Sequence, residues 1–167
     1  LKKNYNPATD SYKTTWTQLS VNCESCHGPA EYHLKWTADK EIDIANYGFV
    51  KNMKNSNNKS QLETCARCHS RRSIYDDYDY KWEQLHEQMA IATIGSPNYH
   101  PDGQIKEEDF EIGSYMQSKM HEMGVKCSDC HNVHSGKVKF QNNQLCTQCH
   151  LPNQYDTEKH HHHQKNQ

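Results

Sequence analysis

Apolar residues recur at helical spacing in only two stretches of the chain, and both predict helices. The clearer one covers residues 106–123, where apolar side chains lie 4, 4 and 3 positions apart on one face: Ile112, Met116, Met120 and Met123. Acidic residues in its first turn suit the positive end of the helix dipole. Gly124 follows and is expected to end this helix in a left-handed conformation.

The second stretch covers about residues 80–92 and brings Trp82, Leu85 and Met89 into register. Residues 51–61 are polar and have no periodic apolar face, so they predict a surface loop. Strand patterns are weak along the whole chain. The predicted fold class is therefore mainly α with extensive irregular coil and few or no strands, in a single domain over residues 1–167.

Composition excludes an ordinary side-chain core. Val, Ile, Leu and Phe together make up 22 of the 167 residues, or 13%. Chains below roughly 20% in these residues usually cannot bury enough apolar surface to fold. No run approaches the roughly 18–20 apolar residues of a transmembrane helix. The chain is nonetheless unlike a disordered polymer, because it has three Trp, ten Tyr and eight Cys in a regular pattern. We therefore expect a group other than the side chains to form the interior.

The eight cysteines occur in four identical patterns, each a C-x-x-C pair followed directly by histidine. The pairs are Cys23 and Cys26, Cys65 and Cys68, Cys127 and Cys130, and Cys146 and Cys149, and the histidines are His27, His69, His131 and His150. Two thiols on one helical turn each form a thioether to a haem vinyl group, and the adjacent imidazole reaches the iron from the proximal side. Four covalent haems c are therefore predicted, packed as the core of the fold.

Other cysteine chemistries fit this pattern less well. Zinc ribbons, iron–sulfur sites and disulfide frameworks also use paired cysteines, but none requires a histidine directly after the second one. Haem is attached covalently outside the cytoplasm, so we expect a periplasmic, cell-surface or extracellular location. The chain begins at Leu1, which removal of a signal peptide explains.

Charge and the basic residues narrow the choice of partners. The polypeptide has 19 basic and 21 acidic residues, a formal net charge of −2. Eight propionates against four ferric centres bring the oxidised holoprotein to about −6, which gives nucleic-acid binding little support. Arg71 and Arg72 follow the second motif and are candidate partners of haem propionates, with a solvated basic pair as the alternative.

The sixth position on each iron decides between electron transfer and substrate binding. The candidate distal ligands are His33, His100, His121 and His134, with His86 and His161 in reserve. His134 is too close to His131 to serve the same haem easily, so we expect it to reach a neighbouring one. Motif starts at 127 and 146 are 19 residues apart, which predicts that the third and fourth haems are close neighbours. The methionine stripe is expected to pack against a porphyrin.

The chain resembles a group of bacterial and archaeal multihaem c-type cytochromes. The matching segments over residues 99–163 are YHPDGQI, GSYMQSKMHEMGVKCSDCHNVHSGK, LCTQCHLP and YDTEKHHHH, and CESCHGPAEYH and CARCHSRR extend the match toward residue 23. The group looks related to tetrahaem cytochrome c554 and the pentahaem nitrite reductases. The resemblance implies that His33, His121 and His134 are distal ligands on haems other than their own.

Two departures from that group bear on function. Larger relatives continue past the run His160–His163 into a further C-x-x-C-H motif, and the nitrite reductases carry a C-x-x-C-K motif that this sequence lacks. We therefore expect an electron carrier with closely spaced bis-histidine haems rather than an enzyme. Its expected partners are redox proteins or other copies of itself in a filament. The alternatives are a reductase of nitrite, hydroxylamine or a sulfur oxyanion, or a fragment of a larger multihaem oxidoreductase.

Overall fold

The structure is a computed structural model, and it describes residues 2–75, 85–92, 94–95, 97–107 and 110–151. Contacts divide the chain into two compact units, Leu1–Val125 and Lys126–Gln167. Each unit contains two of the four C-x-x-C-H motifs. The single tetrahaem domain over residues 1–167 stays a prediction.

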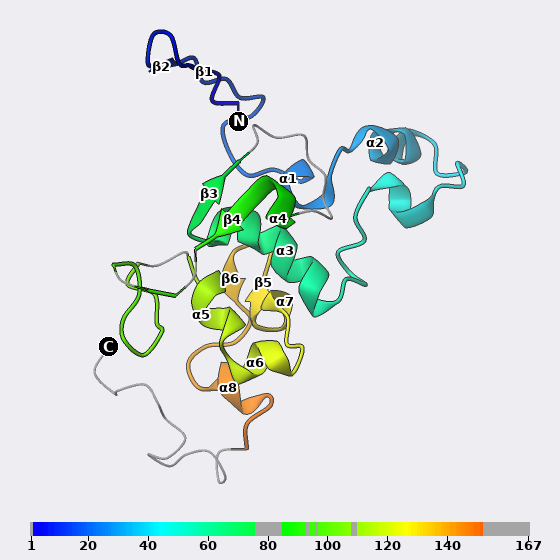
Figure 1. Cartoon of the computed structure of the whole chain (residues 1–167). Coiled ribbons are helices and arrows are strands. Elements are labelled where there is room, and N and C mark those ends of the chain that lie inside the picture. Colours follow the sequence, from blue (N-terminus) through cyan, green and yellow to red (C-terminus); the bar gives the residue numbers. More distant parts are fainter. Residues whose placement is uncertain (1, 76–84, 93, 96, 108–109, 152–167) are drawn as a thin grey trace. The chain divides into compact units, whose positions relative to one another are not determined.

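The helix α3 (Asn58–His69) lies at the centre of the first unit and carries the second motif at its end (Figure 1). It begins where it does because the Asn57 side-chain oxygen accepts a hydrogen bond from the Ser60 amide at 2.8 Å. The short helices α4 (Leu85–Gln88) and α5 (Ile112–Met116) contribute side chains to the same core. So does an antiparallel strand pair, β3 (Arg72–Ile74) with β4 (Met89–Ile91).

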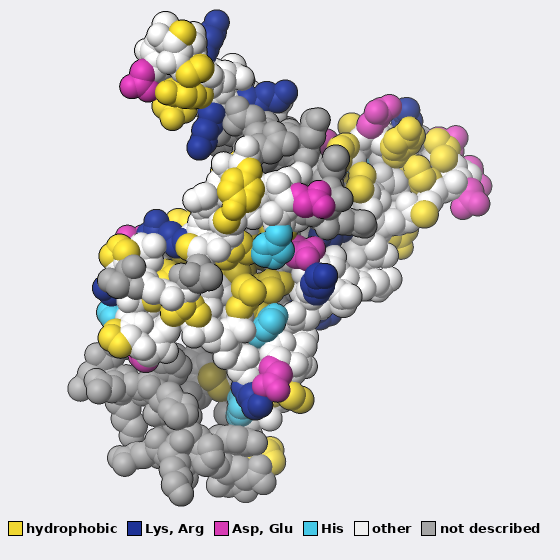
Figure 2. All heavy atoms as spheres, in the orientation of Figure 1, with side chains coloured by type: hydrophobic (Ala, Val, Ile, Leu, Met, Phe, Trp, Pro, Cys, Tyr) yellow, Lys and Arg dark blue, Asp and Glu magenta, His cyan; other side chains and the backbone are white. Residues whose placement is uncertain are grey.

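Five buried side chains form the core cluster: Leu62, Ala66, Leu85, Met89 and Ile112. Cys65 of the second motif packs against this cluster. Most other large apolar side chains of the described residues are exposed, and Figure 2 shows such groups over α2 and again beside histidines near α3. The side-chain core of the described residues is therefore small, and the haem-packed core stays a prediction.

The remaining elements are short (Figure 1). In the first unit they are β1 (Tyr5–Asn6), β2 (Ser11–Tyr12), α1 (Glu24–His27), α2 (Glu31–Ala38), the 3-10 helix η1 (Ala45–Gly48) and α6 (Lys119–Glu122). In the second they are α7 (Cys127–Cys130), β5 (His131–Asn132), β6 (Lys137–Val138) and α8 (Gln144–Thr147). No helix among the described residues is both long and apolar enough to span a bilayer.

The predicted helix over residues 106–123 is wrong as a continuous element. The structure has two helices there, α5 and α6, because Ser118 adopts an extended backbone (φ −79°, ψ 152°). The Ser118 side chain caps the second helix by accepting a hydrogen bond from the His121 amide at 3.2 Å. The predicted stop is confirmed, since Gly124 has φ +78°.

Two further predictions fail in part. The helix over 80–92 is wrong after Gln88, because Met89 begins β4 and pairs with Ile74, and residues 80–84 lie outside the described residues. The loop over 51–61 is wrong from Asn58 onward, where α3 begins after its Asn57 cap. In both places a local contact, a strand pair or a cap, overrides the pattern of apolar residues.

Candidate haem sites

Each of the four motifs occupies one helical turn, as predicted. In three of them the histidine amide donates to the carbonyl of the first cysteine, four residues earlier: His27 to Cys23 at 2.9 Å, His131 to Cys127, and His150 to Cys146 at 2.9 Å. The second motif forms the last turn of α3. None of the eight cysteines forms a disulfide, and each is at least partly exposed.

The donor set of each motif fits a covalent haem c. Two thiols that form no disulfide and an imidazole follow one another on a turn, which is what thioether attachment and proximal ligation require. His27 is half-buried, while His69, His131 and His150 are exposed. Within the part of the chain that the structure describes, no three His, Cys, Asp or Glu side chains gather as a metal cluster.

The motifs lie in two close pairs, one in each unit. The pKa of the Cys26 thiol is raised, and the larger cause is partial desolvation by neighbouring protein atoms, although part of its surface is exposed. The second cause is the nearby Cys68 of the second motif. The pKa of Cys130 is raised by partial burial and then by Asp129 and the cysteines of the fourth motif, Cys149 and Cys146. The third and fourth motifs are thus neighbours, which supports the predicted proximity of their haems.

These raised pKa values give a test of the haem-free chain. At about pH 8, alkylation by iodoacetamide is expected to be slower at Cys26 and Cys130 in the folded chain than in the chain unfolded in urea. The reason is that a raised pKa leaves less reactive thiolate at this pH, and the difference should narrow as the pH rises through the folded-state pKa. Peptide mapping over time measures both rates. Equal rates in the two states would contradict the raised pKa values.

His33 of α2 has the best-defined surroundings among the candidate distal ligands. Its Nδ1–H donates to the carbonyl oxygen of Tyr47 at 2.7 Å. Because a carbonyl can only accept, the neutral ring carries its proton on Nδ1 and leaves the Nε2 lone pair available for iron. The Phe49 ring stacks on His33 with centroids 3.8 Å apart and planes inclined by 20°, and the same ring lies 4.7 Å from His27.

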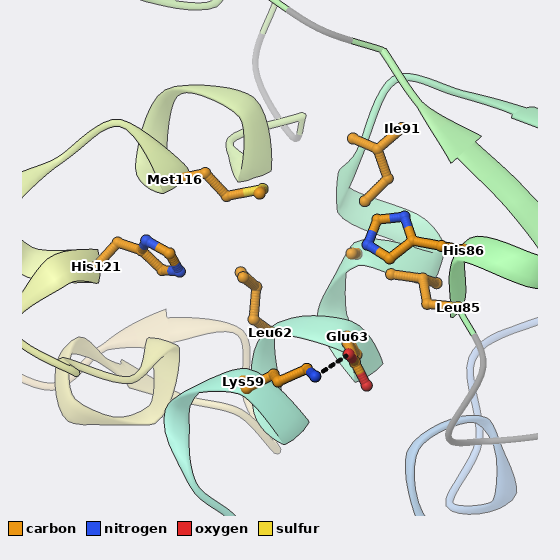
Figure 3. Close-up of a pocket in the computed structure, with 9 residues that line it drawn as sticks. Lys59, Leu62, Glu63, Leu85, His86, Ile91, Met116 and His121 are labelled. Carbon is orange, nitrogen blue, oxygen red and sulfur yellow. Dashed lines mark ion pairs between the residues drawn. The ribbon is translucent and has the colours of Figure 1, made fainter.

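His86 and His121 border one apolar pocket of about 310 Å³ in the first unit. Figure 3 shows them on opposite sides of it, both directed toward the middle, with Leu62 of α3 between them. The remaining lining residues are Lys59, Glu63, Ala66, Leu85, Ile91 and Met116. Neither imidazole makes a hydrogen bond to the described residues, and the His121 ring has only an edge contact with Tyr115 at 5.5 Å. Met116 of the methionine stripe is in this lining, and packing of the stripe on a porphyrin stays a prediction.

The other candidates lie in exposed turns or outside the described residues. His100 is in a turn, where its amide donates to the Gln104 carbonyl at 2.8 Å and its own carbonyl accepts from the Gly103 amide at 2.9 Å. His134 is exposed in the turn between β5 and β6, with its amide 3.2 Å from the Asn132 side chain. His161 and the run His160–His163 lie outside the described residues.

The two arginines after the second motif have different surroundings. Arg71 forms an ion pair with Glu107 and lies 4.2 Å over the Phe110 ring. Arg72 donates through Nη1 to the carbonyls of Cys68 at 3.2 Å and Ser70 at 2.9 Å, and its buried Nε has no partner among the described residues. The buried Nε of Arg71 also has no partner there, so the difference is that Arg71 already has a carboxylate partner and Arg72 has none among the described residues. The propionate role stays a prediction for both.

Comparison with known proteins gives one related protein of stated class. The chain is 26% identical to the protein described as multiheme cytochrome MtrA from Shewanella baltica (strain OS185), over 90% of this chain and 47% of that protein. The chain thus spans about half the length of the curated relative it matches. No family model matches the sequence. No solved structure matches it either. The similarity supports the class of multihaem cytochromes, and the haem number and the distal ligands stay predictions.

Proposed function

We propose that this chain is a tetrahaem c-type cytochrome that transfers single electrons outside the cytoplasm and is not itself an enzyme. The observation that carries the proposal is the placement of all four C-x-x-C-H motifs on single helical turns with every thiol free of disulfides. Similarity to a multihaem cytochrome supports it. When bound, haem iron supplies one-electron chemistry by alternating between its ferric and ferrous states.

The residues of the chain hold, orient and space these groups. The eight cysteines form the thioether tethers, and the proximal imidazoles are those of His27, His69, His131 and His150. The close approach of the first motif to the second, and of the third to the fourth, favours electron transfer within each pair. Arg72 supplies donors for a propionate beside Cys68.

A second histidine on each iron would saturate it and favour electron transfer over catalysis. His33 and His121 are supported by their surroundings, a fixed tautomer in one case and an apolar pocket in the other. His86 shares that pocket, so the structure favours it over His100 as a distal ligand. His134 remains the candidate in the second unit.

The proposal predicts the mass and the spectra of the purified holoprotein. Its intact mass should exceed that of the polypeptide by four covalent haems, and electron paramagnetic resonance of the oxidised protein should show only low-spin iron. A colourless sample with the bare polypeptide mass would overturn the proposal. A high-spin signal that shifts on addition of nitrite or hydroxylamine would instead favour a reductase.

A filament of stacked copies is a finer form of the same proposal. The number of histidines beyond the four proximal ones motivates it, since a ligand donated by a neighbouring copy would join two chains. Electron microscopy of the natively secreted holoprotein tests it. Monomers with every distal ligand from their own chain would contradict the filament while leaving electron transfer unaffected.

A further inference from the structure

The turn that follows α2 has an uncommon backbone. Three successive residues, Asn46, Tyr47 and Gly48, have φ values of +55°, +55° and +78°. Residues with a side chain seldom adopt positive φ, and such a conformation persists only where surrounding contacts impose it. Two adjacent non-glycine residues in this region therefore call for a structural reason.

The contacts that impose this conformation come from the turn itself and from α2. The Asn46 side-chain amide donates to the carbonyl of Phe49 at 2.9 Å, and the Phe49 amide donates back to the Asn46 carbonyl at 3.1 Å. Gly48 is buried against the helix, and a Cβ there would lie 2.5 Å from the carbonyl carbon of Tyr32 and 2.6 Å from the amide of His33. Only glycine allows the turn to approach the helix this closely.

Two residues of the turn contact the His33 side chain. The Tyr47 carbonyl accepts the hydrogen bond from His33 Nδ1 at 2.7 Å. The Phe49 ring covers the face of the same imidazole at 3.8 Å. One contact fixes the tautomer and the other fixes the plane of the ring.

Phe49 also links His33 to the first motif. Its ring lies 4.7 Å from the ring of His27, the proximal ligand of that motif, with the planes inclined by 36°. The proximal imidazole and the candidate distal imidazole therefore share one aromatic neighbour.

We propose that the turn Asn46–Phe49 is a positioning element that holds His33 as an iron ligand through the Tyr47 carbonyl and thereby lowers the reduction potential of the haem it binds. The inference rests on the proposed haem function. A hydrogen bond from Nδ1–H to a carbonyl raises the basicity of Nε2. A more basic ligand binds ferric iron more strongly than ferrous iron, so weakening the hydrogen bond raises the potential.

The test is Gly48→Ala in the full holoprotein, because the added methyl group would force the turn away from α2. Gly124→Ala is the matched control, since Gly124 has the same φ of +78° but nothing within 4 Å of an added Cβ. Potentiometric titration should show one of the four haem potentials raised in Gly48→Ala and none in the control. A tenfold change in the one-electron equilibrium corresponds to about 59 mV. Four unchanged potentials and unchanged g-values in Gly48→Ala would overturn the inference.

Two more variants separate this inference from the proposed function. His33→Ala should convert one haem to high spin, and four low-spin haems in that variant would show that His33 is not a ligand. If His33→Ala has its effect and Gly48→Ala does not, only the positioning role fails. Asn46→Ala removes the hydrogen bond to Phe49 without a backbone clash, so it should raise the same potential by less. It replaces Gly48→Ala as the deciding variant if that chain does not fold, and an unchanged potential would then overturn the inference.

Discussion

Replacing both Cys65 and Cys68 with alanine is expected to remove one haem and to unfold the unit Leu1–Val125. Cys65 packs against the core cluster, and α3 contributes Leu62 and Ala66 to it. The haem tethered there would extend this cluster, which has five buried side chains among the described residues. A small domain is stable by only about 5–15 kcal/mol, and losing a single large buried side chain already costs about 2–5 kcal/mol. The free energy lost with a whole porphyrin at this place should therefore exceed the stability of the unit.

The control is the same pair of substitutions in the fourth motif, Cys146→Ala with Cys149→Ala. Both of these cysteines are exposed, and α8 contains no buried residue. This variant should also lose one haem, but the core cluster of the first unit should stay intact. Intact mass counts the haems, and near-ultraviolet circular dichroism with thermal melts reports the packing. Equal stability of the two double variants would contradict a structural role for the second haem.

The sequence predicts the helical turn of each C-x-x-C-H motif well because the geometry of this turn is local. A C-x-x-C-H motif needs one helical turn, and all four motifs have it in the structure. The stop at Gly124 is local in the same sense, since a left-handed residue at a helix end depends on its own side chain and nearest neighbours. The small side-chain core also follows directly from the scarcity of aliphatic residues.

The longer helices were predicted wrongly because their ends depend on contacts that apolar spacing does not record. Met89 fits a helical face, but pairing with Ile74 places it in a strand. Ser118 fits the interior of a helix, but its side chain caps the next one. Asn57 is the one signal that sequence offered and the periodicity argument missed, since asparagine is a favoured N-cap and α3 begins directly after it.

For the candidate iron ligands, too, the residue itself is identified from sequence but its surroundings are not. His33 is identified from sequence, but the Tyr47 carbonyl and the Phe49 ring that position it lie 14 and 16 residues further along the chain. Every residue has a backbone carbonyl, so residue type does not show which one accepts the hydrogen bond from His33. The Asn-Tyr-Gly sequence indicates only a turn. His86 is a reserve candidate from sequence, and only the packing of α3, α4, α5 and α6 shows that it borders an apolar pocket.

Substituting His86 with alanine is expected to convert one haem to a high-spin form that binds carbon monoxide, whereas His100→Ala should leave all four haems low-spin. The reason is the difference in surroundings. The His86 ring faces an apolar pocket and makes no hydrogen bond to the described residues, so its nitrogen can serve iron without giving up another partner. His100 sits in an exposed turn closed by backbone hydrogen bonds of 2.8 and 2.9 Å, and it does not line the apolar pocket.

Electron paramagnetic resonance of the oxidised variants and carbon monoxide titration of the reduced ones measure the change, with about one binding site expected per His86→Ala chain and none per His100→Ala chain. Both histidines are exposed, so His100→Ala controls for the loss of an imidazole from the surface. High-spin iron in His100→Ala but not in His86→Ala would show that His100 is the ligand and that the pocket binds some other apolar group. High-spin iron in neither variant would mean that both distal ligands of the first unit come from other histidines, with His33 and His121 the two that the same measurement should then identify.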